Sequence, residues 1–185
     1  MFITKKSIIG IIKLTGIIST ESRLGSRGGL NLNDLSDSFT KAFSFKNIKA
    51  MVLLVNSPGG SPVQSTLIAN RIRDIAKEKE IPVYCFIEDL AASGGYWLSC
   101  AADKIYAMES SIVGSIGVIT SGFGAVEAIK KIGIERRVYS QGKSKGLLDP
   151  FLPEKKDDVK QILTIQKDLH SHFIAWVKKR RGKRL

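Results

Sequence analysis

Residues 48–62 read IKAMVLLVNSPGGSP, and they pass from an apolar run through a glycine turn to a helix start. The run over 48–56 is apolar along most of its length, which is typical of a strand buried on both faces of a sheet. Ser61 can cap the helix that follows, and Pro62 suits its first turn. Because strand, tight turn and helix in this order form the unit of parallel sheets, the segment predicts an α/β fold.

The same alternation continues on both sides of this segment. Strands are predicted over 7–19, 48–56, 82–87, 104–108 and 136–141, with a strand or loop over 110–119. Helices are predicted over 34–46, 62–80, the stretch after Ser93 up to Ala102, 123–132 and 153–181, and a glycine-rich loop over 21–33. The pattern predicts a mainly parallel sheet within a single domain that spans residues 1–185.

Composition fits an ordinary globular domain with an excess of positive charge. The chain has 185 residues, of which 43% are hydrophobic, and a formal net charge of +12. Six of the seven residues in 178–184 are basic. We interpret them as solvated cations at a helix C-terminus, where the helix dipole favours them; a patch for anionic lipid or nucleic acid is the alternative. No aromatic-rich nucleic-acid motif accompanies the charge, so no nucleic-acid partner is expected.

Cysteine spacing and hydropathy indicate which kinds of site and which membrane segments are not expected in this chain. Cys85 and Cys100 lie in apolar stretches, and we predict two reduced core thiols. Neither has the spacing of a metal ligand, so no metal and no cofactor are expected. The apolar N-terminal run is interrupted by Lys13, and no uninterrupted apolar run reaches about 18 residues, so no transmembrane helix is predicted. We expect a cytoplasmic protein, with peripheral membrane contact as a second option.

Two glycine-rich loops follow consecutive predicted strands. They are NSPGGS over 56–61 and ASGGYW over 92–97. Because the carboxyl ends of parallel strands share one edge of a sheet, the two loops are expected to face each other there. The main-chain N–H groups of Gly59, Gly60 and Gly94 can then converge on one oxygen and form an oxyanion hole beside Ser93. Considered alone, each loop also has the composition of an ordinary turn without a function.

Ser93 has the setting of an exposed nucleophile but no histidine close to it in sequence. The only histidines are His170 and His172, which lie far downstream in a predicted basic helix. A different group must therefore accept the serine proton, and a buried lysine is the natural candidate. Removal from water favours the uncharged amine that a lysine base requires.

Three separate motifs, in order, resemble those of one peptidase family. They are NSPGGSPVQS at 56–65, IEDLAASGGYWLSCAADKIYAMESSIVGSIGVI at 87–119 and GKSKGLLDPF at 142–151. Together they resemble the signal peptide peptidase A (protease IV) serine peptidases, over a stretch from about residue 8 to the end. The chain resembles Clp peptidase and the crotonases more distantly. The resemblance implies a crotonase/Clp-like fold of stacked ββα units.

The resemblance also implies a mechanism and partners. It assigns Ser93 as nucleophile and Lys145, in the third motif, as general base of a Ser–Lys dyad; Lys143 is the local competitor, which we interpret as a solvated loop lysine. It implies short apolar or signal-peptide-like peptide substrates. It also implies a homo-oligomer in which neighbouring subunits can complete the dyad.

Other polar residues near these motifs are expected to have structural roles. Four further serines are interpreted as turn, cap or packing residues, namely Ser57, Ser61, Ser99 and Ser115. Asn56 and Asp149 are expected to orient loops.

The chain departs from the family in two respects. No N-terminal membrane anchor is found, and about sixty further residues expected from the family do not follow residue 185, so the C-terminal part of the family domain is expected to be missing. The alternative hypothesis is therefore a catalytically inactive, truncated member that acts as a binding or assembly module. A crotonase-type acyl-CoA enzyme is a third hypothesis, but no paired glutamates lie near the loops.

Overall fold

The computed structural model describes residues 7–20, 29–142 and 145–184, and the chain divides into two compact units. The first unit comprises Met1–Gly117 and His172–Leu185, and the second comprises Val118–Ser171. Both loops predicted to form the oxyanion hole belong to the first unit.

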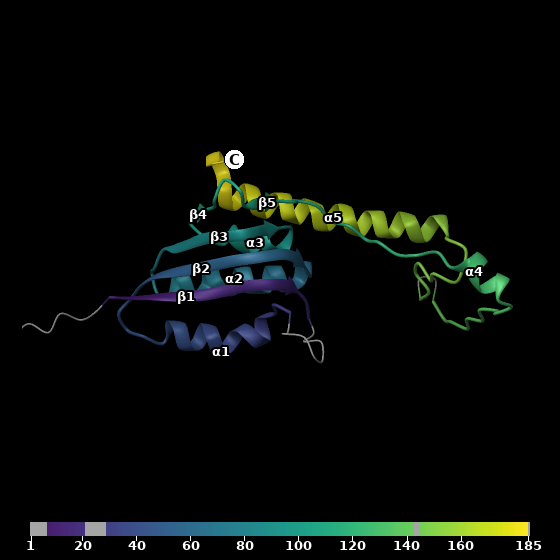
Figure 1. Ribbon diagram of the computed structural model, residues 1–185, viewed down its shortest axis with the longest axis horizontal. Helices are drawn as coiled ribbons and strands as arrows, with labels where there is room; N and C mark the ends of the chain where they lie inside the picture. The colour runs from purple at the N-terminus through teal and green to yellow at the C-terminus, as the bar shows by residue number, and fades with distance from the viewer. Residues whose placement is uncertain (1–6, 21–28, 143–144, 185) are drawn as a thin grey trace, which may run out of the picture. The chain divides into compact units, whose positions relative to one another are not determined.

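The first unit is built on a parallel sheet (Figure 1). Its strands are β1 (Ile8–Ile18), β2 (Ile48–Gly60), β3 (Val83–Ala92), β4 (Lys104–Tyr106) and β5 (Ile112–Gly114). The order is β1-β2-β3-β4, β5 pairs with β3, and every pair of strands is parallel. The predicted α/β fold with a mainly parallel sheet is confirmed. β2 and β3 both extend beyond their predicted ends, so that β2 includes Gly59 and Gly60.

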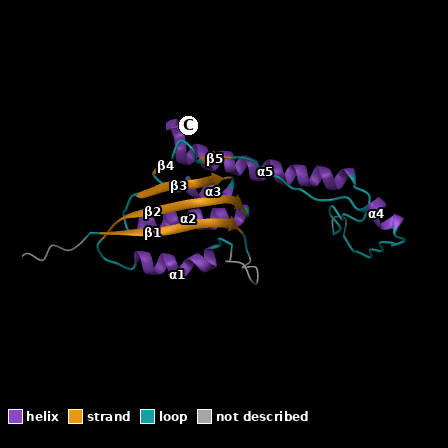
Figure 2. Cartoon of the chain, in the orientation of Figure 1, coloured by secondary structure: helices purple, strands orange, loops and turns teal. Residues whose placement is uncertain are grey.

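Three helices of the first unit pack on one face of this sheet. They are α1 (Leu32–Phe43), α2 (Pro62–Glu78) and α3 (Gly94–Ser99) (Figure 2). The starts of α1 and α2 carry side-chain caps: Asn31 Oδ1 accepts from Asp34 N at 2.9 Å, and Ser61 Oγ, as predicted, accepts from Gln64 N at 3.3 Å. Pro62 occupies the first turn of α2, as predicted.

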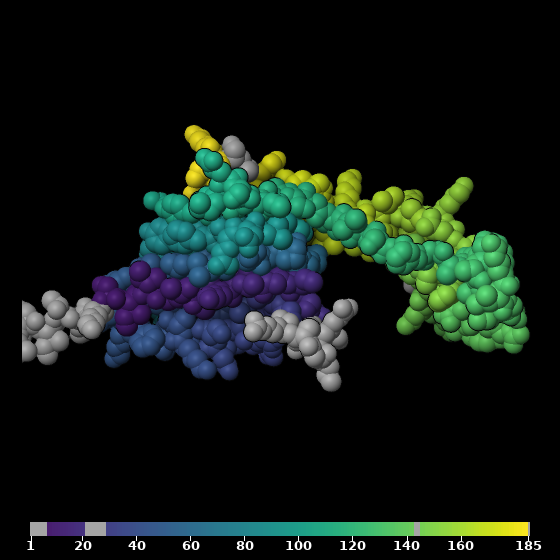
Figure 3. Space-filling model, viewed as in Figure 1, coloured from purple at the N-terminus to yellow at the C-terminus, as the bar shows by residue number. Residues whose placement is uncertain are grey.

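The prediction that β2 and β3 are buried on both faces is wrong for the chain by itself. Leu53 and Cys85 are fully buried under the helices, whereas Leu54, the neighbour of Leu53 in β2, is half-buried and Phe86 is 42% exposed. In Figure 3 the strands face the viewer across the middle of the first unit, with α1 visible below β1. The sequence suggests burial on both faces because aliphatic and aromatic side chains occupy the outer face of the sheet as well. The described helices of this unit, however, cover only the inner face.

The second unit contains α4 (Val126–Lys131) and the first part of α5 (Lys156–Arg181). Gly133, with φ of +74°, follows the end of α4 as the sequence predicts. The strand predicted over 136–141 does not form: this stretch is irregular, and its Tyr139 is 92% exposed. A strand requires a neighbour to pair its N–H and C=O groups, and no described strand pairs with this stretch.

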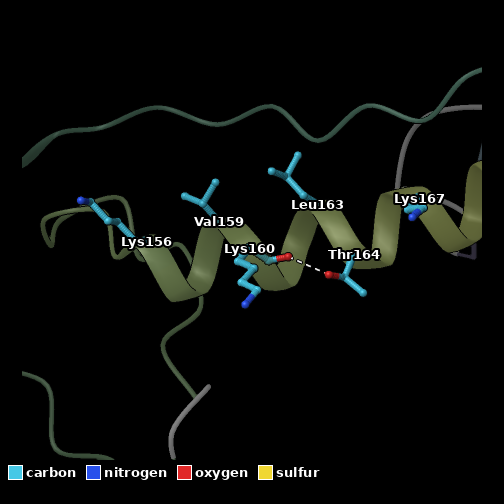
Figure 4. Close-up of a pocket in the computed structure, with 6 residues that line it drawn as sticks. All are labelled: Lys156, Val159, Lys160, Leu163, Thr164 and Lys167. Carbon is cyan, nitrogen blue, oxygen red and sulfur yellow. Dashed lines mark hydrogen bonds between the residues drawn. The ribbon is translucent and has the colours of Figure 1, made fainter.

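The predicted apolar stripe of α5 is buried only toward its C-terminal end. Phe173 and Val177 are buried in the core of the first unit, whereas Leu163 is 58% exposed. Figure 4 shows Val159 and Leu163 projecting to the same side of the first half of the helix. With Thr164 and three lysines they line an open hollow of about 400 Å³. The helical period therefore predicts the helix correctly but not the burial of its first half. After α5 the chain ends in a 3₁₀ turn, η1 (Gly182–Arg184).

Candidate active site

Ser93 lies at the sharp turn between β3 and α3. Its backbone has φ of 51° and ψ of −120°, a region that side-chain-bearing residues rarely adopt. Such a conformation costs about 1–3 kcal/mol and persists only where surrounding contacts hold it. Here the Ser93 N–H donates to Gly114 O at 2.8 Å, and the Ser93 carbonyl accepts from Trp97 N at 3.0 Å. The side chain is partly exposed.

The Ser93 hydroxyl is not used as a helix cap. Serine before a helix usually accepts a hydrogen bond from an N–H of the first turn, as Ser61 does for α2. Ser93 makes no such bond to α3. The hydroxyl is therefore not engaged by its own helix, as is expected of a serine at a strand-to-helix nucleophile turn.

The two glycine-rich loops lie in contact beside Ser93. A Cβ atom on Gly59 would lie 2.6 Å from Gly94 N and 2.8 Å from Ser93 Cβ, and Gly59 has φ of +96°. Only glycine fits this position, because a side chain would collide with the nucleophile turn itself. A Cβ on Gly94 would in turn lie 2.5 Å from Ser65 Oγ, at the start of α2.

Ser57 shapes the first loop from within. Its buried hydroxyl donates to Gly16 O at 2.7 Å and accepts from Gly59 N at 3.1 Å. The Gly59 N–H that the sequence assigns to an anion is therefore engaged by Ser57 in this structure. Gly60 packs directly on the backbone of Ile18 in β1 and has φ of +141°. Ser57 lies within β2 and is fully buried, so of the turn, cap and packing roles predicted for this group of serines it has the packing role.

Neighbouring polar residues fix the ends of the central strands. Asn56 Nδ2 donates to Asp89 Oδ2 at 2.7 Å, which links β2 and β3 a few residues before the glycines of the two loops. Beyond the two loops, Ser99 Oγ donates to Gly95 O at 3.0 Å within α3. Asn56 and Ser99 thus have the loop-orienting and packing roles that the sequence predicts for them.

The far end of α3 contains functional candidates that the sequence does not reveal. Arg180 of α5 donates to three main-chain carbonyls and to Asp103, and Trp176 donates to Trp97 O. Partial burial opposes ionisation of Asp103, but the Val83 N–H and the neighbouring arginines lower the pKa of this carboxyl overall. The solvated-cation interpretation of residues 178–184 is therefore wrong for Arg180. No sequence signal identifies it, because it binds main-chain carbonyls, which every residue has.

Lys145 belongs to the second unit and is exposed. It lies in the turn that follows Gly142, and the same segment continues to Asp149, which accepts from Phe151 N at 3.0 Å and from Arg136 at 3.1 Å. These two donors hold the pKa of Asp149 below its usual range. Asp149 thus orients the loop, as the sequence predicts. Lys143, the competitor, lies outside the described residues.

The two cysteines are free, buried thiols, as the sequence predicts. Burial raises the pKa of Cys85 to about 12 and that of Cys100 to about 11. Since the thiolate is the nucleophilic form, neither thiol is a candidate nucleophile.

The described part of the chain offers neither a metal cluster nor a spanning helix. Across 7–20, 29–142 and 145–184, no group of three or more His, Cys, Asp or Glu side chains has the arrangement of a metal site. Within the same ranges, no helix combines the length and apolar character needed to span a membrane.

Comparison with known proteins identifies the family. Residues 75–184 match peptidase family S49. The chain is 35% identical over 180 residues to the putative signal peptide peptidase SppA of Enterococcus faecium, and the match covers 97% of this chain and 51% of that protein. It is 48% identical over 177 residues to a Brucella melitensis protein named Na(+)/H(+) antiporter NhaA, with 96% of this chain and 24% of that protein covered.

The chain thus spans between about a quarter and a half of the length of these relatives. Among solved structures, it is similar to a mutant of ClpP1 from Listeria monocytogenes, with 22% identity, a TM-score of 0.36, and coverage of 50% of this chain and 46% of that one. The family resemblance drawn from the three motifs is confirmed. The chain belongs to peptidase family S49.

Proposed function

We propose that the chain is a serine endopeptidase domain in which Ser93 is the nucleophile. The observation that carries the proposal is the strained turn at Ser93, with φ of 51°, packed so closely against Gly59 that only glycine fits there. A fold does not hold a serine in this conformation without compensating contacts, and such strain gathers at functional sites. Membership of family S49 supports the same role.

The oxyanion donors are the Gly94 N–H and the turn at Gly59 and Gly60. Gly94 begins α3, and the first N–H groups of a helix have no acceptor within the helix. Because the Gly59 N–H already donates to Ser57, the Gly60 N–H is the donor that we assign to the substrate from the first loop. Two such donors stabilise the negative charge that develops on the carbonyl oxygen during attack.

Lys145 is the general base, and a neighbouring copy of the chain completes the dyad. Lys145 is exposed in the single chain, whereas a lysine base must be kept uncharged by removal from water. Assembly into a homo-oligomer would supply that burial. The exposure of Lys145 therefore supports a site that is formed only on assembly.

The reaction has two steps in which atoms and protons balance. Ser93 Oγ attacks the peptide carbonyl carbon while Lys145 Nζ takes the hydroxyl proton, and the same proton then passes to the leaving amine as the C–N bond breaks. In the second step a water attacks the carbonyl carbon of the resulting ester while Lys145 Nζ takes one of its protons. Lys145 returns that proton to Ser93 Oγ as the ester C–O bond breaks, which releases the carboxyl product and restores the serine and the neutral amine.

The substrate class is short, apolar and extended peptide, including signal-peptide-like segments. β5 pairs with β3 just before Ser93 and exposes Ile112 and Val113, which are 66% and 43% exposed. Among the described strands, β5 pairs only with β3, so its other edge is open to an added strand. An extended apolar peptide placed there would lie beside Ser93.

The test compares three proteins with one peptide substrate and one covalent probe. Wild type, Ser93→Ala and Lys145→Ala are incubated with a fluorogenic leucine-rich peptide and with a fluorophosphonate probe, and labelling is located by mass spectrometry. We expect labelling of wild type at Ser93 and at least a roughly 1,000-fold loss of cleavage in both variants. Equal cleavage by all three proteins, or no labelling of wild type, would contradict the proposal and favour the binding or assembly module.

A further inference from the structure

The C-terminal end of α3 is enclosed by side chains of α5 from far along the chain. A short helix leaves its last carbonyls without main-chain donors, yet here each carbonyl from Tyr96 to Ala102 accepts a hydrogen bond. The main-chain bonds are Cys100 N to Tyr96 O (2.9 Å), Ala101 N to Leu98 O (2.9 Å) and Ala102 N to Ser99 O (3.0 Å). The side-chain bonds are Trp176 Nε1 to Trp97 O and Arg180 Nε to Cys100 O (3.0 Å each), and Arg180 Nη2 to Ala101 O and Ala102 O (3.2 Å each).

Arg180 is suited to this position by the shape of its guanidinium. The planar fork of N–H donors reaches three consecutive carbonyls and also Asp103 Oδ1 at 3.1 Å, and its side chain is only 19% exposed. Arg73 of α2 adds bonds to Ala101 O at 3.0 Å and to Asp103 Oδ1 at 2.9 Å. A lysine ammonium is a single point and cannot span this set of oxygens.

Ring packing holds the outer side of the same helix. Trp97 of α3 stacks on Trp176 with ring centroids 6.0 Å apart and planes at 13°, and it contacts Phe173 at 4.9 Å. The Arg180 guanidinium lies 6.0 Å from the centre of the Trp176 ring. All of these contacts lie within the first unit.

Trp97 connects this end of α3 to the nucleophile. Its main-chain N–H donates to the Ser93 carbonyl at 3.0 Å, and its own carbonyl accepts from Trp176. α3 has only six residues, so a shift at its far end is a shift at Ser93 and Gly94 as well. The unfavourable φ of Ser93 must be held by contacts outside the residue, and those of α3 are among them.

We infer that Arg180 and Trp176 are positioning residues for Ser93: they fix α3 from its carbonyl end and so hold the nucleophile turn in its reactive geometry. The inference rests on the proposed role of Ser93. It assigns a catalytic consequence to the last turns of α5, which touch neither substrate nor reacting atoms.

The experiment compares Arg180→Met with Lys178→Met in the full chain. Lys178 is exposed in the same turn, so the control removes the same charge without touching α3. We measure the second-order rate of fluorophosphonate labelling at Ser93, and kcat and KM for the fluorogenic peptide, at a temperature where circular dichroism shows each variant folded. Arg180→Met should lower the labelling rate and kcat roughly 10- to 100-fold with KM unchanged, because small misplacements of a nucleophile cost that much. Lys178→Met should match wild type.

Two conservative variants keep the test decisive if Arg180→Met does not fold. Arg180→Lys keeps the charge but loses the fork, and Trp176→Phe keeps a ring but loses the N–H; both should label several-fold more slowly than wild type. Folded variants that label at the wild-type rate would overturn the inference while leaving the proposed function intact. Wild type that fails to label at Ser93 would overturn both.

Discussion

The Ser93 turn and the Lys145 loop differ in how many contacts within the chain hold them in place. Both main-chain groups of Ser93 are hydrogen-bonded, and Gly59 of β2 packs against the turn. Lys145 is exposed, and a Cβ on the adjacent Gly146 would meet nothing within 4 Å. The difference indicates that one chain preorganises the nucleophile and oxyanion half of the proposed site. The base half, as we propose it, requires burial of Lys145, which we propose a second copy provides.

The strongest test of whether Ser93 and Lys145 come from different copies of the chain is to mix two inactive variants. In a 1:1 mixture of Ser93→Ala and Lys145→Ala that is dissociated and reassembled, a site shared between subunits has an intact serine and lysine in about a quarter of cases. We therefore expect recovery of about a quarter of wild-type cleavage from two proteins that are each inactive. The assay is hydrolysis of the fluorogenic peptide before and after mixing.

The outcome separates two arrangements of the dyad. If both residues of a site come from the same chain, every site in the mixture lacks one of them and no activity returns. A mixture that stays inactive although exchange of subunits is demonstrated would contradict assembly across subunits, and Lys145 would then have to be buried within its own chain.

A second experiment compares one glycine from each loop. Gly59→Ala places a methyl group against Gly94 N at a φ of +96°, and we expect a loss of about 2–4 kcal/mol in the free energy of unfolding. Labelling at Ser93 should be lost as well. Gly146→Ala meets open space and should change stability by less than about 0.5 kcal/mol.

Urea unfolding followed by circular dichroism measures both glycine variants. A Gly59→Ala protein as stable as wild type would show that the two loops do not pack in solution as they do here. A strongly destabilised Gly146→Ala protein would show instead that the Lys145 loop is packed as tightly as the Ser93 turn.

A smaller change in the free energy of unfolding is expected from Asp103→Asn. This substitution weakens the hydrogen bonds that Asp103 forms with Arg73 and Arg180 at the C-terminal end of α3. Because Asp103 is 39% exposed, solvent screens its ion pairs, and we expect a loss of only about 1 kcal/mol at pH 7. The lowered pKa of Asp103 means that the unfolded chain binds this proton more readily. The stabilisation is therefore complete above the ordinary pKa of about 3.8 and is lost as pH falls through the lower, folded value.

Tryptophan fluorescence can measure this change in stability. Trp97 and Trp176 are the two tryptophans of the chain, and they stack on each other where α3 meets α5. Unfolding of wild type and Asp103→Asn is followed in urea at pH 7, 5 and 3. The difference in stability should be similar at pH 7 and 5 and smaller at pH 3. A difference that grows on acidification would contradict the assigned direction of the pKa shift.

Local sequence signals predicted the elements around the site well. The strand and the capped helix at 48–62 form as expected, because Ser61, Pro62 and the apolar run each act within a few residues, although the strand continues through the two glycines. The glycines at 59 and 94 could be recognised as special, since close approach of two backbones requires the smallest residue. The segment over 136–141 was misleading, because strand propensity has no effect without a pairing neighbour.

Residue types alone determined that this chain forms a parallel α/β sheet with two glycine loops at one edge, and that its candidate serine must work without a nearby histidine. Both follow from local pattern and composition, which need no knowledge of distant contacts. Only the tertiary structure decided that Arg180 and Trp176 enclose the helix behind Ser93 and that the outer face of the sheet is left exposed. The physical reason is that these contacts join main-chain carbonyls and surfaces about eighty positions apart, and a carbonyl has no signature in the sequence.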